Sequence, residues 1–309
     1  MPSALVIGGN GFLGSHFKDA FQRAEIPITV LSPHPELFRP ENLAVRHVHG
    51  HLDIGSDISA LLAENDWVVH VGSSATPASV QRAPAASIGP ALASIAWLAE
   101  RCREAGTKAL LYVASGGTIY GPDESRRPHR ESDPLRPISS YGALSAACEL
   151  VLQGILAGSD TRLISLRVAN AYGERQDPAR EQGIIAAAGS RLLRQQPVVL
   201  YGDGSQVRDF IYAGDMARLG LRCLAGTFDG PINCGSGQGV SIAELLEKLE
   251  AVARQTFRYE RRPARPYDAK YVVLDPARAF QLGWKPEVSL ESGLLQTWRW
   301  LSSEFGAIS

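Results

Sequence analysis

Short apolar runs alternate with longer amphipathic segments through the first half of the chain. The runs are too short for helices and predict strands, whereas the amphipathic segments predict helices. The predicted strands are 4–7, 28–31, 44–49, 67–71, 109–114 and 162–168, and the predicted helices are 15–24, 58–64, 91–105 and 140–157. This alternation predicts an α/β fold with a doubly wound parallel sheet and helices on both of its faces.

The pattern changes after Ala169, where loops rich in glycine, proline and charge predominate. They surround one predicted helix near 183–194, and a short strand at 232–233 is expected to return to the first sheet. Apolar residues at helical spacing predict a terminal helix whose packing face is Leu294, Leu295, Trp298 and Leu301. No linker separates the halves, so we expect two interleaved lobes with ligand sites at the carboxyl ends of the strands.

Composition narrows the classes of partner and compartment. The chain has 309 residues and a formal net charge of -1, which gives no electrostatic footprint for nucleic acid or a membrane surface. No apolar stretch approaches the ~20 residues of a membrane span, and we expect no secretory signal. The four cysteines form no CxxC pair, which favours reduced thiols in a cytoplasmic protein; they are Cys102, Cys148, Cys223 and Cys234.

Three glycines spaced three apart follow the first predicted strand and open the first predicted helix. The first permits a tight turn, the second lets backbone N–H groups approach a pyrophosphate, and the third lets the helix pack close to the strand. The helix N-terminus then faces the phosphates with the positive end of its dipole. The sequence therefore predicts a nicotinamide dinucleotide site that includes Gly8, Gly11, Phe12, Leu13 and Gly14.

Several later segments, in order, extend the pattern. They are LYVASGGTIYGP at 111–122, PISSYGALS at 137–145, RVANAYG at 167–173, YGDGSQVRDF at 201–210, RPYD at 265–268 and LGWKP at 282–286. Together with the glycines, they resemble the extended short-chain dehydrogenase/reductase family. The resemblance is to its NAD-dependent nucleotide-sugar epimerase/dehydratase branch, of the UDP-glucose 4-epimerase type. The resemblance implies a Rossmann-type dinucleotide-binding domain at 1–170 with a return segment near 209–236. It also implies that 171–309 is a smaller, interleaved and mainly substrate-binding lobe.

The resemblance implies that Tyr141 is the general acid/base. A free phenol has a pKa of ~10 and is a poor base near neutrality unless its anion is stabilised. The family supplies a lysine four residues on, on the same helix face, and Ser145 stands there in this chain. The family residue that orients the reacting oxygen aligns near Gly116, which leaves Ser115 and Thr118 as its substitutes.

The implied cofactor contacts also depart from the family pattern. Ser32 replaces the acidic residue that grips the adenosine ribose, and Leu52 lies beside the position of the adenine contact. Loss of that carboxylate removes repulsion against a 2′-phosphate, so NAD is expected and NADP is permitted. Arg39 is a distant candidate for the phosphate, and Ala91 replaces an asparagine that the family carries in the following helix.

The expected substrate is a nucleoside diphosphate sugar. By resemblance, Arg208 and Arg265 meet the diphosphate or the nucleoside ribose, and Asn170 donates to a phosphate oxygen. Two structural alternatives stay open at this point: an ion pair between Arg208 and Asp209, and a solvated basic loop around Arg265.

Histidines offer a second kind of chemistry, which we do not favour. His47, His49 and His51 alternate along a predicted strand and could share a face, but no carboxylate or cysteine partner accompanies them, so no metal site is predicted. His70 resembles a histidine of the family and is expected to be a satisfied buried group.

The sequence thus predicts an NAD(P)-dependent 4-epimerase of a nucleotide-activated sugar that acts through a keto intermediate. Two alternatives remain. The altered residues Ser145, Ala91 and Gly116 are compatible with a sugar-nucleotide- or cofactor-binding protein of reduced or no redox activity, and Ser32 is compatible with an NADPH-dependent keto-sugar reductase. A homodimer formed through the helices 91–105 and 140–157 is the family-based expectation.

Overall fold

The computed structural model describes residues 1–309 except 40–43, 73–74, 181, 266–267 and 307–309. The chain divides into two compact units, each assembled from three separate stretches. The first unit consists of Met1–Ser115, Ser139–Arg167 and Ala217–Ile232, and the second of Gly116–Ile138, Val168–Met216 and Asn233–Ser309. The segment 116–138, which the sequence analysis placed in the dinucleotide-binding domain, therefore lies in the second unit.

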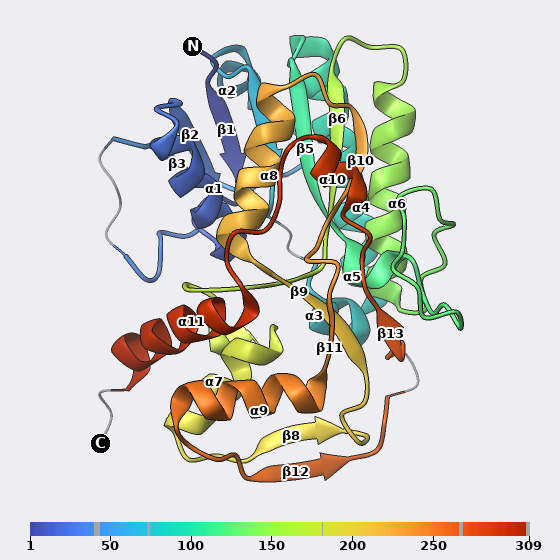
Figure 1. Cartoon of the computed structure of the whole chain (residues 1–309). Helices are drawn as coiled ribbons and strands as arrows, with labels where there is room; N and C mark the ends of the chain where they lie inside the picture. Colours follow the sequence, from blue (N-terminus) through green and yellow to red (C-terminus); the bar gives the residue numbers. More distant parts are fainter. Residues whose placement is uncertain (40–43, 73–74, 181, 266–267, 307–309) are drawn as a thin grey trace. The chain divides into compact units, whose positions relative to one another are not determined.

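The central sheet has seven strands in the order β10-β6-β5-β4-β1-β2-β3 (Figure 1). The strands are β1 (Ala4–Ile7), β2 (Ile28–Ser32), β3 (Arg46–His49), β4 (Trp67–His70), β5 (Ala109–Ser115), β6 (Arg162–Val168) and β10 (Gly230–Cys234). The pairings of β1 with β2 and β4, of β2 with β3 and of β4 with β5 are parallel. The strand order reverses between β1 and β4, and this reversal is where open α/β sheets bind ligands. The predicted doubly wound sheet, with its returning strand, is confirmed.

Both faces of this sheet carry helices, as expected for strands that are apolar on both sides. The helices are α1 (Phe12–Arg23), α2 (Ser59–Ala63), α3 (Pro77–Arg82), α4 (Pro84–Ala105), α6 (Ser140–Leu156) and α8 (Ala213–Ala225). Leu5 and Leu110 belong to a buried cluster that includes residues of α2, α4 and α6. On the other face, a Cβ at Gly220 of α8 would lie 2.5 Å from the Phe17 ring of α1, so the absence of that Cβ lets the two helices approach.

A buried ion pair fastens α6 to the sheet. Glu149, which is fully buried, accepts from Arg167 Nε of β6 at 3.0 Å, and Nη2 of the same guanidinium makes a second contact. A charge removed from water needs an opposite charge and good hydrogen bonds to offset the loss of hydration, and the two-point contact supplies both. The pair therefore sets where the α6 helix lies on the sheet.

The second unit is built around smaller sheets. Strands β11 (Gly239–Ser241), β9 (Val207–Tyr212) and β13 (Tyr271–Val272) are adjacent in that order, β7 (Asn170–Tyr172) also pairs with β9, and β8 (Val198–Tyr201) pairs with β12 (Tyr259–Arg262). The helical elements are α5 (Gly116–Ile119), η1 (Pro178–Arg180), α7 (Ile184–Leu193), α9 (Ile242–Ala253), α10 (Ala277–Gln281) and α11 (Leu290–Phe305). Side chains from β7, β8, β9, α7, α9 and α11 form one apolar core.

The sequence pattern identified α7 and α11 in this unit but missed α9 and most of the short strands. Buried Leu294 and Leu301 lie on the inner face of α11, as expected. Trp300, which does not belong to that face, contacts the Phe305 ring edge to face. Strands of two to four residues carry too few alternating positions to stand out from loops.

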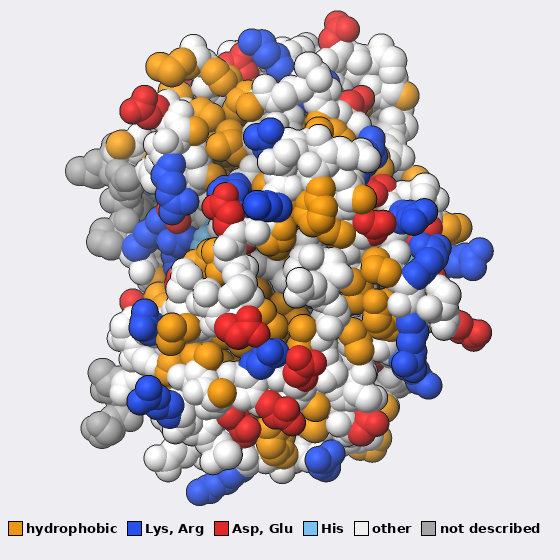
Figure 2. All heavy atoms as spheres, in the orientation of Figure 1, with side chains coloured by type: hydrophobic (Ala, Val, Ile, Leu, Met, Phe, Trp, Pro, Cys, Tyr) orange, Lys and Arg blue, Asp and Glu red, His pale blue; other side chains and the backbone are white. Residues whose placement is uncertain are grey.

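The surface carries both signs of charge. Lysine and arginine side chains are interspersed with aspartate and glutamate over the face drawn in Figure 2. Within the part of the chain that the structure describes, no helix is long and apolar enough to cross a membrane.

Replacing Glu149 with Gln should lower the free energy of unfolding by about 3 kcal/mol, because the buried Arg167 guanidinium would lose the negative charge of the carboxylate that faces it. Denaturant unfolding followed by circular dichroism measures the loss. The matched control is Glu104→Gln, which breaks the exposed pair with Arg101 and should cost at most about 1 kcal/mol. Equal losses of unfolding free energy in the two variants would show that the buried pair stabilises the chain no more than the exposed pair does.

Candidate active site

The turn between β1 and α1 depends on glycine. Gly8 has φ +82°, and a Cβ there would lie 2.5 Å from the Cα of Gly72, which follows β4. A Cβ on Gly14 would lie 2.3 Å from the Gly8 carbonyl oxygen and 2.6 Å from the Cα of Gly9. Side chains at these positions would collide with backbone, so the turn can close against α1 and the strand end only with glycine. The structure thus brings Gly8, Gly11 and Gly14 together at the reversal of strand order.

The N-terminus of α1 is open to an anion. Gly11 caps the helix without a side chain, its N–H donates to the Gly8 carbonyl at 3.0 Å, and the first turn carries no acidic residue. Phe12 and Leu13 are the first residues of the helix. The first N–H groups of a helix have no partner within it and sit at the positive end of its dipole, so this turn fits the pyrophosphate of a dinucleotide.

Ser32 and Leu52 lie near the end of the next two strands. Ser32 is the last residue of β2, is buried, and accepts at its carbonyl from the Gly50 N–H at 3.1 Å. Leu52 packs against the apolar core on the α4 and α6 side of the sheet. The position that ends β2 therefore offers a hydroxyl group and no charge.

Arg39, the candidate for a 2′-phosphate, is committed to other groups. Its Nη1 lies 2.5 Å from Asp19 and its Nε lies 2.5 Å from Glu36, whose other oxygen is 2.5 Å from the Lys18 ammonium. Burial lowers the pKa of Arg39, but the hydrogen bond and charge of Asp19, with Glu36, outweigh burial and raise it overall. The partnership of Lys18, Asp19 and Glu36 with Arg39 is not visible in the sequence, because it joins α1 to the segment after β2.

The first turn of α6 holds Tyr141, and Ser145 lies one turn further on. The Ser139 side chain caps the helix by accepting from the Gly142 N–H at 3.1 Å. Ser145 is buried, and its Oγ accepts from the Ser115 backbone N–H at 3.0 Å. The serine at the family's lysine position therefore ties α6 to the end of β5, and brings Ser115, Ser145 and Tyr141 into one region of the first unit.

Among the residues that the structure describes, no cation takes the electrostatic role of the missing lysine at Tyr141. Burial raises the pKa of Tyr141, and the neighbouring Cys148 raises it further. The described cations contribute nothing to this shift, so the phenol is held in its protonated form. At pH 7 a phenol with a pKa above ~10 is ionised in fewer than roughly one molecule in a thousand. Tyr141 is therefore present as the neutral phenol, and little phenolate is available at pH 7 to accept a proton.

Tyr112 is a neighbour that sequence reasoning missed. Its hydroxyl hydrogen-bonds with Cys148 and Ser145, and burial, followed by Cys148, raises its pKa well above the ordinary value. The aromatic ring stacks on His70 with centroids 5.9 Å apart. The alternation of residues along β5 indicates that Tyr112 is buried. It does not reveal which helix packs over that face of the strand.

The histidines follow their separate environments. Burial lowers the pKa of His70 to about 4, so this imidazole is neutral at pH 7. His47 and His49 lie in β3, whereas His51 lies beyond the strand and contacts the His34 ring edge to face. Among the described residues, no group of three or more histidine, cysteine, aspartate or glutamate side chains is placed to hold a metal ion.

The second unit contains Thr118, Asn170, Arg208 and Arg265. Thr118 lies in the single turn α5. Asn170 begins β7 and donates from Nδ2 to the Asp209 carbonyl at 2.9 Å, which orients its amide. Of the RPYD segment, Pro266 and Tyr267 lie outside the described residues.

Arg208 and Asp209 do not use each other as partners. The buried carboxylate of Asp209 accepts from Ser236 N–H and Oγ, from Gly237 N–H and from Leu274 N–H. Burial raises its pKa to about 6 despite these donors. Arg208, on the opposite face of β9, donates from Nη1 to the Val207 carbonyl at 2.9 Å, and burial lowers its pKa. The expected alternative of a local ion pair is therefore wrong, and Arg208 is a desolvated cation that an anionic ligand would stabilise.

Arg265 is ordered by an aromatic ring. Its guanidinium carbon lies 3.5 Å from the centroid of the Tyr201 ring. A hydrogen bond from Arg265 is the main cause that lowers the pKa of Tyr201. Half-buried and stacked, Arg265 is not a freely solvated loop residue, and its planar fork is held ready for a phosphate or a ribose.

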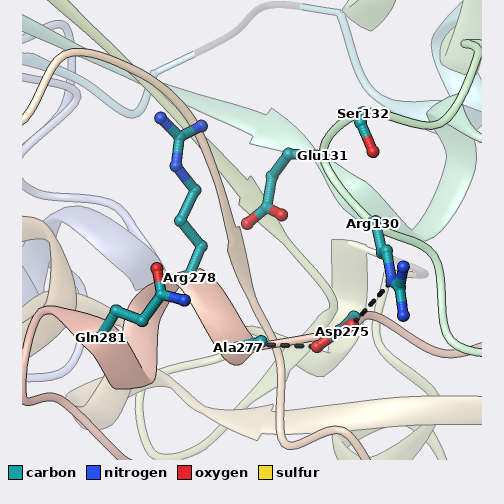
Figure 3. Close-up of a pocket in the computed structure, with 7 residues that line it drawn as sticks. All are labelled: Arg130, Glu131, Ser132, Asp275, Ala277, Arg278 and Gln281. Carbon is teal, nitrogen blue, oxygen red and sulfur yellow. Dashed lines mark hydrogen bonds and ion pairs between the residues drawn. The ribbon is translucent and has the colours of Figure 1, made fainter.

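A cavity of about 350 Å³ lies elsewhere in the second unit (Figure 3). Its charged groups are engaged within the chain: Arg130 Nε lies 3.3 Å from Asp275, and Glu131 accepts from the Asn233 N–H at 2.8 Å. The lining contains none of the residues that the sequence singled out.

Comparisons with known proteins agree with this geometry. Residues 4–235 match the NAD dependent epimerase/dehydratase family. The UDP-glucose 4-epimerase of Mycolicibacterium smegmatis is 30% identical over 95% of this chain and 96% of that protein. The structure is similar to the Thermus thermophilus UDP-glucose 4-epimerase complex with NAD, with a TM-score of 0.91, 30% identity, and coverage of 99% and 100% of the two chains. It is also similar to the Thermotoga maritima UDP-glucose 4-epimerase with UDP-glucose, with a TM-score of 0.91, 28% identity, and coverage of 98% and 99%.

Replacing Gly14 with Ala should destabilise the chain by about 2 kcal/mol, because its Cβ would overlap the Gly8 carbonyl. It should also weaken NAD binding, since the turn must open to relieve the overlap. Thermal unfolding and calorimetric titration with NAD measure the two effects. The control, Gly154→Ala, lies on the exposed side of α6 with open space around it and should stabilise slightly or have no effect. Unchanged NAD affinity in a folded Gly14→Ala variant would argue against this turn as the pyrophosphate site.

Proposed function

We propose that this chain inverts the configuration at C4 of the sugar in a nucleoside diphosphate sugar, because it belongs to the NAD-dependent epimerase/dehydratase family. The observation that carries the proposal is Tyr141, a half-buried phenol in the first turn of α6, in the same unit as the glycine turn. The glycine turn is the proposed seat of NAD. The substrates named for the relatives support a UDP-sugar.

The residues of the first unit fit a dinucleotide. Gly8 and Gly14 let the turn close against the strand end and α1. The N-terminus of α1, where Gly11 provides no side-chain cap, is the proposed seat of the pyrophosphate, and Ser32 and Leu52 are the proposed neighbours of the adenosine. When bound, NAD would supply the redox chemistry by taking hydride from the sugar C4 and returning it to the other face of the keto sugar.

Tyr141 is the proposed acid/base. It would take the proton of the sugar C4 hydroxyl during oxidation and return a proton when the ketone is reduced. The raised pKa of the phenol makes the first half of this cycle the harder one. Ser115, at the end of β5, and Thr118 are the proposed hydrogen-bonding partners of the sugar oxygen.

The anionic end of the substrate needs cations. Arg208 and Arg265 are the proposed partners of the diphosphate or the nucleoside ribose, and Asn170 is a proposed donor to a phosphate oxygen. The half-buried setting of Arg208 and the stacking of Arg265 on Tyr201 support these roles, since both arginines are already ordered.

One observation favours a second function. The Ser145 hydroxyl accepts from the Ser115 N–H, and none of the described cations lowers the pKa of Tyr141. These features suit a protein that binds a nucleotide sugar or cofactor and turns it over slowly or not at all. A reductase is a less favoured use of the same fold, because Arg39 is paired with Asp19 and Glu36.

We also propose a homodimer formed through α4 and α6, in a cytoplasmic protein. The two helices pack side by side, and α6 leaves Leu150 58% exposed. Light scattering after gel filtration should give twice the chain mass of 33.3 kDa. Leu150→Glu should halve that mass, since a charge would be desolvated at the interface. A wild-type monomer would contradict the proposal.

The proposed activity predicts that the purified chain converts UDP-glucose or a related UDP-sugar to its C4 epimer in the presence of NAD. Tyr141→Phe keeps the ring and removes the hydroxyl, so kcat should fall by about 100-fold or more. Anomeric proton signals in NMR spectra distinguish the two epimers. NAD affinity, measured by calorimetry, should change little, which separates loss of chemistry from loss of binding.

The cofactor released on denaturing the purified chain distinguishes the two functions. Near-stoichiometric NAD supports the epimerase, because the cycle regenerates its cofactor. A chain that binds UDP-sugar but neither retains nor binds NAD would support the binding protein and contradict the epimerase.

The rate should rise towards alkaline pH, because the phenolate of Tyr141 forms only as the pH approaches its raised pKa. Ser145→Lys places a positive charge one turn away, which lowers that pKa and should move the rising limb by about one pH unit towards neutrality. The control is Ser145→Met, which has a similar length, loses the same bond to Ser115 and adds no charge. A flat profile from roughly pH 6 to 10, with no gain in the lysine variant, would contradict Tyr141 as the base.

A further inference from the structure

Four charged side chains form a cluster between α1 and the segment that follows β2. Lys18 and Glu36 are both nearly inaccessible, with side chains 2% and 3% exposed, and lie 2.5 Å apart. Arg39 reaches the second oxygen of Glu36 and also Asp19. The four formal charges cancel, and Glu36 is the member that joins the two cations.

The cluster is attached to the glycine turn. Asn10, which stands between Gly8 and Gly11, accepts from the Lys18 ammonium at 3.0 Å and donates to the His34 carbonyl at 2.9 Å. His34 lies two residues beyond Ser32, at the end of β2. Lys18 and Arg39 therefore lie next to the part of the site where the adenosine ribose of a dinucleotide is read.

That position decides between the two dinucleotides. NADP differs from NAD only in a 2′-phosphate on the adenosine ribose, and an arginine near the end of the second strand commonly receives it. Ser32 neither repels the phosphate nor binds it through charge. Among the described residues, Lys18 and Arg39 are cations next to this position, and whether they are available to an anion bears directly on discrimination between NAD and NADP.

We infer that Glu36 makes the site selective for NAD, because its carboxylate supplies from within the chain the negative charge that these cations would otherwise take from a 2′-phosphate. The inference rests on the proposed dinucleotide site. It assigns specificity to a residue four positions beyond the one at which the family carries its acidic group. Glu36 is a specificity residue and takes no part in the chemistry.

The test compares the dissociation constants of NAD and NADP for the full-length chain by calorimetry. The wild type should bind NAD at least about tenfold more tightly than NADP. Glu36→Gln keeps the side-chain shape and removes the charge, so the preference should move towards NADP by about tenfold or more, as charge-assisted bonds to phosphate replace the lost pair. Stabilisation against heat by NADP, relative to NAD, should increase in parallel.

Two variants control for charge and packing. Lys18→Met combined with Glu36→Gln removes one of the two cations that Glu36 holds, leaves Arg39 with Asp19 and should gain less NADP affinity than Glu36→Gln alone. Glu64→Gln, which breaks the exposed pair with Arg46, raises the net charge as Glu36→Gln does and should leave the preference unchanged.

Other results would overturn the inference. If the wild type binds NADP as tightly as NAD, the inference is wrong, and this result does not depend on whether Glu36→Gln folds. The inference is also wrong if a folded Glu36→Gln variant keeps the wild-type preference for NAD over NADP. It is wrong as well if Glu64→Gln shifts that preference as much as Glu36→Gln does. A wild type that binds neither dinucleotide contradicts the proposed site itself, and is distinguished from the other results by the absence of any NAD signal.

Discussion

The architecture of the first unit depends on a backbone contact that tolerates no side chain. At the reversal of strand order, Gly8 lies against Gly72, and Gly14 of α1 lies against Gly8. Because the backbones meet directly, α1 begins beside the carboxyl ends of β1 and β4, and its first N–H groups, which have no partner within the helix, lie at this edge of the sheet. The same close approach that packs the helix on the sheet therefore creates the anion site.

Helix α6 is positioned by two polar contacts, and its chemistry follows from them. Glu149 is paired with Arg167 of β6, and Ser145 accepts from the Ser115 N–H at the end of β5. A lysine at position 145 would give up the second contact in exchange for a charge near Tyr141. Serine gives a fixed helix and a protonated phenol, so the residue that secures the helix also limits the fraction of Tyr141 that is phenolate near neutral pH.

The second unit relies on buried polar groups that each join several segments. Asp209 accepts four hydrogen bonds from segments around Ser236 and Leu274, while Asn233 bonds with the Tyr120 hydroxyl and with two backbone carbonyls. Since each buried polar atom must find a partner, these residues allow few alternative arrangements of the loops. They fix the strand from which Arg208 projects and the loops beside it.

The sequence by itself determined the parallel sheet, the glycine turn and the placement of Tyr141 one helical turn before Ser145, because these features depend on periodicity and on spacing over a few residues. Only the tertiary structure decided that Tyr112 contacts Ser145, that Glu36 holds Lys18 and Arg39, and that Asp209 does not pair with Arg208. These pairings join elements that are distant in sequence. Packing and burial decide which side chains meet, and the spacing of residues along the chain carries no information about either.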